Sequence, residues 1–150
     1  MRAIVTGSRT WKESVLVFAA LDTLTDSGDL TVVHGDCPEG ADRWAKIWCS
    51  KQVYLSKCRV KEEPYPANWA TYGNRAGFIR NQEMVNLGAD VVLAFSDWCT
   101  KLTCPWYKRH MSHGTENCVQ AARNARIEVV EFGVTISETH LRLDREAGNV

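Results

Sequence analysis

Apolar and polar positions along the chain predict strands and helices in strict succession. Short apolar or β-branched runs, typical of strands, occupy residues 2–6, 30–34, 59–64, 89–95 and 127–132. Between them, apolar residues recur at helical spacing over residues 12–26, from residue 41 to between 51 and 58, over 72–84 and from 112 to 125. Strands that alternate with helices five times predict an α/β fold, a doubly wound and mainly parallel five-stranded sheet of order 3-2-1-4-5 with helices on both faces.

The chain length predicts one domain with a sizeable core. We assign residues 1–133 to this domain, with an irregular insertion at 96–111, and residues 134–150 to a C-terminal tail. The 18 basic residues balance the 18 acidic ones, so the charge gives no reason to expect a nucleic-acid or membrane partner. The chain runs from Met1 into a strand without the pattern of a signal peptide, which predicts a cytoplasmic protein.

The predicted helix over residues 72–84 carries an arginine on its core side. Helical indexing places four apolar residues on one face: Ala76, Ile79, Met84 and Leu87. The charged residues Arg80 and Glu83 fall among them, whereas Phe78 and Val85 point to the opposite face. A guanidinium on the core side is costly unless a negative group meets it. Either Arg80 pairs with Glu83, or it faces a crevice and binds a phosphate or carboxylate there; we favour the second.

Two predicted strands end in glycine-bearing loops. Gly7-Ser-Arg-Thr-Trp11 follows the first strand, and Gly35 to Asp42 follows the second and leads into a helix. A strand, a glycine loop and a helix N-terminus together favour an anion, because unpaired amides and the positive helix end point at the loop. The loops match neither a Walker motif nor a strict GxGxxG pattern, and we expect no cofactor. Asp42 is equally consistent with a helix cap and with a hydrogen bond to a ligand hydroxyl.

In the predicted strand order, the switch point lies between the first and fourth strands. The Gly7 loop and the turn Ser112-His-Gly-Thr115 then face each other across one crevice, with the Gly35 loop beside it. The predicted ligand-binding residues come from these segments and from the arginine helix: Gly7, Ser8, Arg9, Thr10, Gly35, Asp36, Gly40, Asp42, Arg75, Arg80, Asn81, Ser112, His113, Gly114 and Thr115. Nearby, Tyr65, Trp69 and Tyr72 either stack on a planar ring or pack within their own loop.

The six cysteines raise two further questions, whether they form disulfides and whether some of them bind a metal. Without a secretion signal, free thiols are the better expectation than disulfides. In the insertion, Cys99 and Cys104 precede His110 and His113, and these residue types are zinc ligands. Their spacing fits no standard finger or ribbon, so the sequence predicts no metal site and keeps a zinc-stabilised interaction module as an alternative.

The order of these motifs resembles a known family. The carrying residues are Gly7 to Trp11, His34-Gly35 with Gly40-Ala-Asp42, Pro66-Ala-Asn-Trp69, Tyr72 to Met84, Leu93-Ala-Phe95 and Ser112 to Thr115. They resemble the YspA-like branch of the SLOG superfamily, which includes cytokinin-activating phosphoribohydrolases and DNA-processing protein A, and the resemblance covers roughly residues 2–132. The resemblance implies a Rossmann-like fold, a nucleotide or nucleotide-derived ligand with its phosphate at a helix N-terminus, a bacterial or phage protein, and a homodimer.

The same resemblance bears on catalysis. The phosphoribohydrolases use an arginine in an Arg-Lys-x-x-Met pattern and a glutamate in a Gly-Thr-x-x-Glu pattern. Arg80 matches the arginine, but Asn81 stands in place of the lysine and Cys118 in place of the glutamate. Glu116 lies about 160° away around the helix. The catalytic candidates are therefore Arg80, Glu83 and Glu116, and the hypotheses are ligand binding without turnover or hydrolysis of an N-glycosidic bond.

Overall fold

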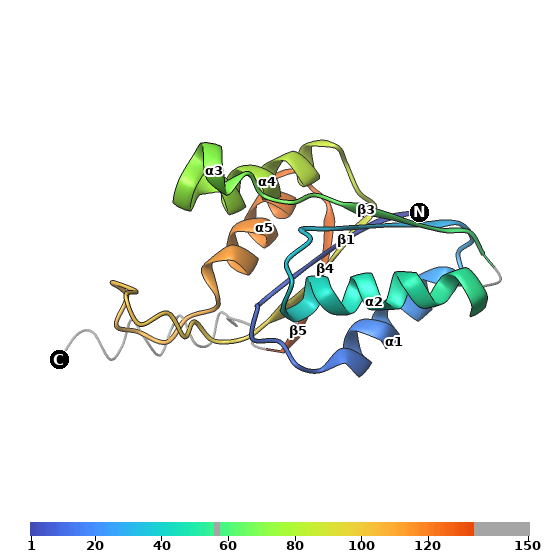
Figure 1. The fold of residues 1–150 in the computed structure, drawn as a ribbon, viewed down its shortest axis with the longest axis horizontal. Helices are drawn as coiled ribbons and strands as arrows, with labels where there is room; N and C mark the ends of the chain where they lie inside the picture. The colour runs from blue at the N-terminus through green and yellow to red at the C-terminus, as the bar shows by residue number, and fades with distance from the viewer. Residues whose placement is uncertain (56–57, 134–150) are drawn as a thin grey trace.

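The computed structural model describes residues 1–55 and 58–133 and shows a five-stranded sheet with helices on both faces (Figure 1). Its strands are β1 (Arg2–Gly7), β2 (Leu30–His34), β3 (Val60–Pro64), β4 (Val91–Ser96) and β5 (Glu128–Gly133). They lie in the order β3-β2-β1-β4-β5, and each neighbouring pair is parallel. The predicted fold class and strand order are confirmed.

The helices form one layer on each face of the sheet (Figure 1). On one face, α1 (Ser14–Thr25) and α2 (Gly40–Leu55) bury Val17, Leu21 and Trp48 in a first core cluster. On the other face, α4 (Ala76–Asn86) and α5 (His113–Asn124) bury a second cluster that includes Met84 and Cys118. All six residues of β4 are buried, as its continuous apolar run predicts for a central parallel strand.

The single helix predicted over residues 72–84 is wrong in its boundaries. The structure has a short helix α3 (Trp69–Tyr72), a 3-10 turn η1 (Gly73–Arg75) and then α4. Asn68 begins α3, since its side-chain oxygen accepts a hydrogen bond of 3.0 Å from the amide of Thr71. Gly73 breaks the helix with a φ of 53°, a left-handed conformation that glycine adopts readily.

The predicted faces of α4 also need correction. Val85, expected to point away from the core, is buried in the second cluster, whereas Leu87 lies beyond the end of the helix and is 59% exposed. The physical reason is that α4 packs on α5 as well as on the sheet, so its buried arc is wider than a single stripe. This second contact also buries Asn81.

The connection from β4 to α5 is irregular, as the sequence predicts for the insertion. Its ends are joined by an isolated antiparallel bridge between Trp98 and Met111, and the Cys99 amide donates to the His110 carbonyl at 2.8 Å. Among the helices of the described residues, none has both the length and the apolarity needed to cross a bilayer. The predicted C-terminal tail, residues 134–150, lies outside the described residues.

Candidate functional site

The loops after β1 and β4 meet at the switch point of the sheet through a chain of hydroxyl groups. Ser8 Oγ lies 2.6 Å from Ser112 Oγ, and Ser112 Oγ lies 2.8 Å from Thr115 Oγ1. Ser8 Oγ also accepts from the Asp97 amide at 2.8 Å, and Thr10 Oγ1 donates to Asp97 Oδ2 at 2.7 Å. The two loops that the sequence placed across one crevice are therefore in direct contact, and they fix the start of α5 against β1.

The start of α5 leaves backbone amides unpaired in the described part of the chain, beside a cavity that its first two residues, His113 and Gly114, line. Within the described residues, no hydrogen-bond partner is found for the amides of His113, Gly114 and Thr115, and Ser112 makes no side-chain capping bond to the backbone. The cavity beside them, which we call the helix cavity, has a volume of about 510 Å³. Its lining residues are Ser8, Arg9, Thr10, Trp69, Asn74, Trp98, Cys99, Thr100, Lys101, Ser112, His113 and Gly114. Unpaired amides at the positive end of a helix dipole favour a bound anion.

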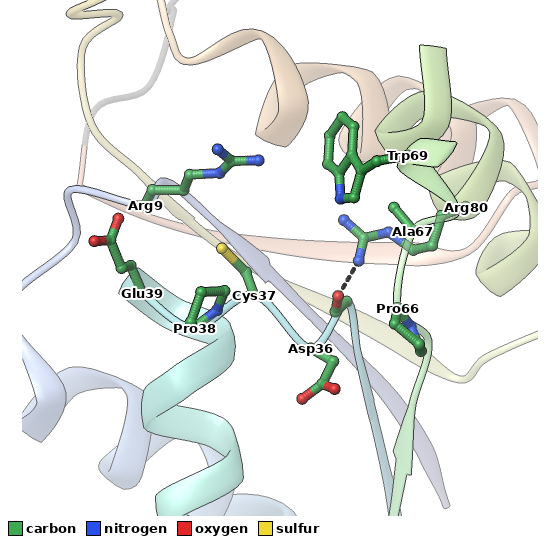
Figure 2. A pocket seen from close by; sticks show the side chains of 10 residues that line it. Arg9, Asp36, Cys37, Pro38, Glu39, Pro66, Ala67, Trp69 and Arg80 are labelled. Atoms are coloured by element: carbon green, nitrogen blue, oxygen red, sulfur yellow. Dashed lines mark hydrogen bonds between the residues drawn. The ribbon is translucent and has the colours of Figure 1, made fainter. Parts of the chain in front are cut away.

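A second cavity, the loop cavity, adjoins the first and shares Arg9 and Trp69 with it. It has a volume of about 440 Å³ and is lined by Arg9, Gly35, Asp36, Cys37, Pro38, Glu39, Pro66, Ala67, Trp69 and Arg80. Figure 2 shows the guanidinium group of Arg9 reaching across the cavity towards Trp69, while Arg80 lies on the same side as Trp69 with its guanidinium turned to the Gly35 loop. The Arg9 guanidinium carbon lies 5.7 Å from the centre of a Trp69 ring, so a cation and an aromatic face stand together where the two cavities meet.

Arg80 is partly committed to the protein's own backbone. Its Nη1 donates to the carbonyl oxygen of Gly35 and, at 3.0 Å, to that of Tyr65, while Nε donates to Asn81 Oδ1 at 3.0 Å. A side chain at position 35 would overlap this guanidinium, which explains the glycine. For Nη2, the described part of the chain provides no partner, so this edge of Arg80 is available to a ligand in the loop cavity.

The loop between β2 and α2 is braced by Gly40 and Asp42. Gly40 has a φ of 70°, and a Cβ there would overlap the Ser8 carbonyl oxygen, so α2 begins in close contact with the β1 loop. The buried Asp42 carboxylate accepts from the Cys37 amide at 3.2 Å. Burial raises the pKa of Asp42, and the nearby Arg80 opposes this shift. Asp42 lies in the first turn of α2 and lines neither cavity; its hydrogen bond to the Cys37 amide braces the loop before the helix, and neither of the two roles weighed above is tested.

Hydrogen bonds of Asp36 and His34 fix the same loop to the end of β2. Asp36 adopts a φ of 51°, and its amide donates to His34 Nδ1 at 3.0 Å. His34 is fully buried and contacts Glu62 through Nε2 at 2.9 Å, so both ring nitrogens are occupied. The Asp36 carboxylate pairs with Lys46 at 2.8 Å, which reduces its repulsion of an anion in the loop cavity.

Several other predicted residues lie away from the two cavities. Arg75 and Glu83 are exposed and line neither, and no Arg80–Glu83 pair is found among the described residues. Asn81 is buried and donates to the Gly114 carbonyl and to Asn117 Oδ1, both at 3.1 Å, which ties α4 to the start of α5. Glu116 accepts from Gln120 at 2.9 Å outside both cavities.

The position that the resemblance to the phosphoribohydrolases gives to a catalytic glutamate is closed to a ligand. Cys118 stands there, is fully buried in the second core cluster, and burial raises its pKa to about 11. The thiol is therefore protonated and uncharged at neutral pH. Of the acidic residues named above, Asp36 lines the loop cavity, and Glu39 was not anticipated there.

The structure also brings together the four residues of the alternative zinc set. The ligand atoms of Cys99, Cys104, His110 and His113 all lie within 4.8 Å of one another at the edge of the helix cavity. Burial lowers the pKa of His113, and His110 and Lys101 lower it further. This cluster is the group of described residues suited to holding a transition metal.

Sequence reasoning missed the contribution of the insertion to the helix cavity. Trp98, Thr100 and Lys101 line it, and Lys101 adds a cation beside the amides of α5. In the sequence, this segment has no periodicity that indicates which way its side chains face. Cys37 to Glu39 were also missed as lining residues, although their position inside the Gly35–Gly40 loop was a usable signal.

The parallel sheet, with its two cavities at the switch point, defines a Rossmann-like α/β domain. A family model described as the YspA, cpYpsA-related SLOG family matches residues 1–72. The chain is also 39% identical, over 137 residues, to the Gene 61 protein of Mycobacterium phage D29; this match covers 88% of the chain and 96% of that relative. The chain belongs to the YspA, cpYpsA-related SLOG family.

Membership of this family supports a general role in binding or modifying a nucleotide-related ligand. The phage relative fits the expectation of a bacterial or phage protein. No solved structure shows a significant match to the chain. The predicted homodimer and cytoplasmic location stay predictions.

Proposed function

We propose that the chain binds a nucleotide or a nucleotide-derived ligand across both cavities and senses or sequesters it without turning it over. The phosphate lies in the helix cavity, on the amides of His113, Gly114 and Thr115. The nucleoside extends past Trp69 into the loop cavity. The observation that carries this proposal is the row of unpaired amides at the start of α5, opening into a cavity that also contains cationic side chains.

The charges around the helix cavity support this orientation. Arg9 and Lys101 both line it and are exposed, so both cations are accessible to an anion there. A charge-assisted hydrogen bond contributes about 1.5–3 kcal/mol, so each of the two cations would add to the attraction of the helix N-terminus for a phosphate. The hydroxyl chain from Ser8 to Thr115 holds the amides in place before the ligand binds.

The loop cavity provides the features that a nucleoside requires. Trp69 is 50% exposed and presents an aromatic face on which a base can stack. The free edge of Arg80 and the polar backbone of the Gly35 loop offer donors and acceptors for ribose or base. Each cavity falls within the size range of small-molecule sites, about 300–1,000 Å³.

The placement of the acidic residues supports binding over hydrolysis. Cleavage of an N-glycosidic bond requires a carboxylate placed beside the sugar. Glu83 and Glu116 lie outside the two cavities, and the buried Cys118 occupies the position that the resemblance to the phosphoribohydrolases gives to a catalytic glutamate. The acidic groups that do line the loop cavity are Asp36, which pairs with Lys46, and Glu39 at its exposed rim.

Calorimetry with AMP, ADP-ribose and cyclic nucleotides tests the proposal, followed by chromatography of each mixture after incubation. We expect saturable binding of at least one of these compounds and its recovery unchanged. Release of a free base would instead establish the hydrolase alternative. Failure of every phosphorylated compound to bind at millimolar concentration would contradict the proposed function.

A further inference from the structure

The insertion between β4 and α5 and the first residue of α5 form a side-chain cluster. The proposed function uses the backbone amide of His113 but none of the cluster's side chains. Its members are Cys99, Cys104, His110 and His113, and their ligand atoms lie within 4.8 Å of one another. We propose that these two thiolates and two imidazoles bind one zinc ion in a closed, tetrahedral, structural site.

The distances between the ligand atoms fit a metal of this size. Tetrahedral Zn–S bonds of about 2.3 Å and Zn–N bonds of about 2.0 Å place a sulfur and a nitrogen about 3.5 Å apart and two nitrogens about 3.3 Å apart. Cys104 Sγ lies 3.5 Å from His110 Nε2 and 3.2 Å from His113 Nε2. The two Nε2 atoms are 3.1 Å apart. A small adjustment of side chains is enough to admit the ion.

The orientation of His110 is typical of a metal ligand. Its Nδ1 lies 2.7 Å from the Lys108 carbonyl oxygen. Because a carbonyl can only accept, Nδ1 carries the proton and Nε2 presents its lone pair to Cys104 and His113. A backbone carbonyl that fixes the tautomer of a histidine in this way is the usual outer contact of a metal-bound imidazole.

Backbone pairing within the insertion also brings the residues of the cluster together. The antiparallel bridge between Trp98 and Met111 and the hydrogen bond from the Cys99 amide to the His110 carbonyl bring the two ends of the insertion side by side. The Trp106 ring covers the imidazoles, with its centre 5.0 Å from that of His110 and 5.6 Å from that of His113. An aromatic cover limits the access of water to the site.

The insertion needs a stabilising contribution that its side chains do not supply. Between Cys99 and His110, no described residue is buried, and both Leu102 and Tyr107 are almost fully exposed. Cys99 and Cys104 are free thiols, so no disulfide holds the segment. In small segments without a core, metal binding supplies folding free energy directly. Binding of Zn²⁺ releases one proton from each of the two thiols, and four protein ligands leave no open position for catalysis.

Metal analysis of the full chain, purified without a histidine tag, tests this site directly. We expect one zinc per chain by mass spectrometry. After chelation, titration with Co²⁺ should give the visible absorption bands of a tetrahedral site together with a thiolate charge-transfer band. Cys104→Ser should weaken zinc binding by about 100-fold or more, whereas Cys37→Ser, outside the cluster, should retain full zinc.

The wild-type measurements decide the question even if Cys104→Ser does not fold. Substoichiometric zinc together with an octahedral Co²⁺ spectrum, or with no spectral change, would overturn the proposal. A Cys37→Ser variant that loses zinc to the same extent as Cys104→Ser would overturn the assignment of ligands. None of these outcomes depends on nucleotide binding.

Discussion

Arg9 is the residue whose charge most directly tests the binding site. It is exposed, lines both cavities, and among the described residues its recorded contact is the one with Trp69. Arg9→Gln should therefore remove a phosphate contact at the cost of this one exposed contact with Trp69. We expect an affinity for AMP or ADP-ribose about 10- to 100-fold lower, the equivalent of one charged hydrogen bond, with only a small change in melting temperature. Calorimetry and thermal unfolding measure both.

Arg126→Gln provides the matched control for this variant. Arg126 is also exposed, but it precedes β5 and so lies at the opposite edge of the parallel sheet from the cavities. Its replacement should leave the affinity as it is. Equal losses in both variants would indicate a non-specific charge effect and contradict the assigned site.

Arg80 is less suitable for such a test, although the sequence singled it out first. Its hydrogen bonds to the carbonyls of Gly35 and Tyr65 mean that Arg80→Ala also removes the donor of two part-buried backbone acceptors, so a loss of binding could come from a rearranged loop. That the arginine is turned inward could be predicted from helical periodicity. The sequence could not predict which N–H groups of Arg80 bind the backbone and which face the cavity, because this depends on where two distant loops expose their carbonyl groups.

At the scale of elements, the contact between the β1 loop and the start of α2 depends on Gly40. Gly40→Ala puts a Cβ against the Ser8 carbonyl in a backbone conformation that disfavours it. We expect a loss of about 2 kcal/mol or more in the free energy of unfolding, measured by urea denaturation. Gly28→Ala, with a φ of 103° but open space around it, is the control and should cost less. Equal losses would show that the close contact contributes nothing.

An ion cluster on Glu63 links β1 and β3 and makes stability depend on pH. The pKa of Glu63 is lowered by hydrogen bonds from Lys61 first and from Arg2 next. Because the folded-state pKa lies below the unfolded value, this stabilisation is present above about pH 4.5 and is lost as the pH falls through the lowered pKa.

Glu63→Gln should therefore unfold more easily than wild type at pH 7, and this difference should shrink at pH 3. Urea titrations at the two pH values measure it. Glu13→Gln serves as the control, since Glu13 makes no ion pair within the described residues. If the difference in free energy of unfolding between wild type and Glu63→Gln is the same at both pH values, the ion cluster on Glu63 does not make stability depend on pH.

The elements themselves were largely predictable from the sequence. Parallel strands buried on both faces are continuous apolar runs, and β4 is the clearest case. The break at Gly73 was missed, because a glycine within a helical pattern does not by itself show that it adopts a positive φ. The insertion was the hardest segment: the Trp98–Met111 bridge helps to bring the four candidate zinc ligands together, and no periodic pattern in the sequence predicts that bridge.

At the scale of the whole molecule, the proposed zinc site and the proposed binding site are coupled. His113 belongs to the cluster and also begins α5, and Cys99 to Lys101 line the helix cavity. Removal of zinc with a strong chelator should lower the melting temperature and weaken nucleotide binding, because one wall of the helix cavity loses its support.

Thermal unfolding and calorimetry before and after chelation measure both effects, and restoration by added Zn²⁺ is the control. The Cys104→Ser variant should behave like the chelated protein and should need a much higher concentration of Zn²⁺ for restoration than the wild type needs. If chelation removes zinc yet changes neither quantity, the metal does not support the cavity.

The central claim is that the amides at the start of α5 bind the phosphate of a nucleotide. A crystal structure of the chain grown with AMP or ADP-ribose tests it most directly. The account predicts a phosphate oxygen about 3 Å from the amides of Gly114 and Thr115, and the base beside Trp69. A nucleotide bound elsewhere, with these amides facing only solvent, would contradict it.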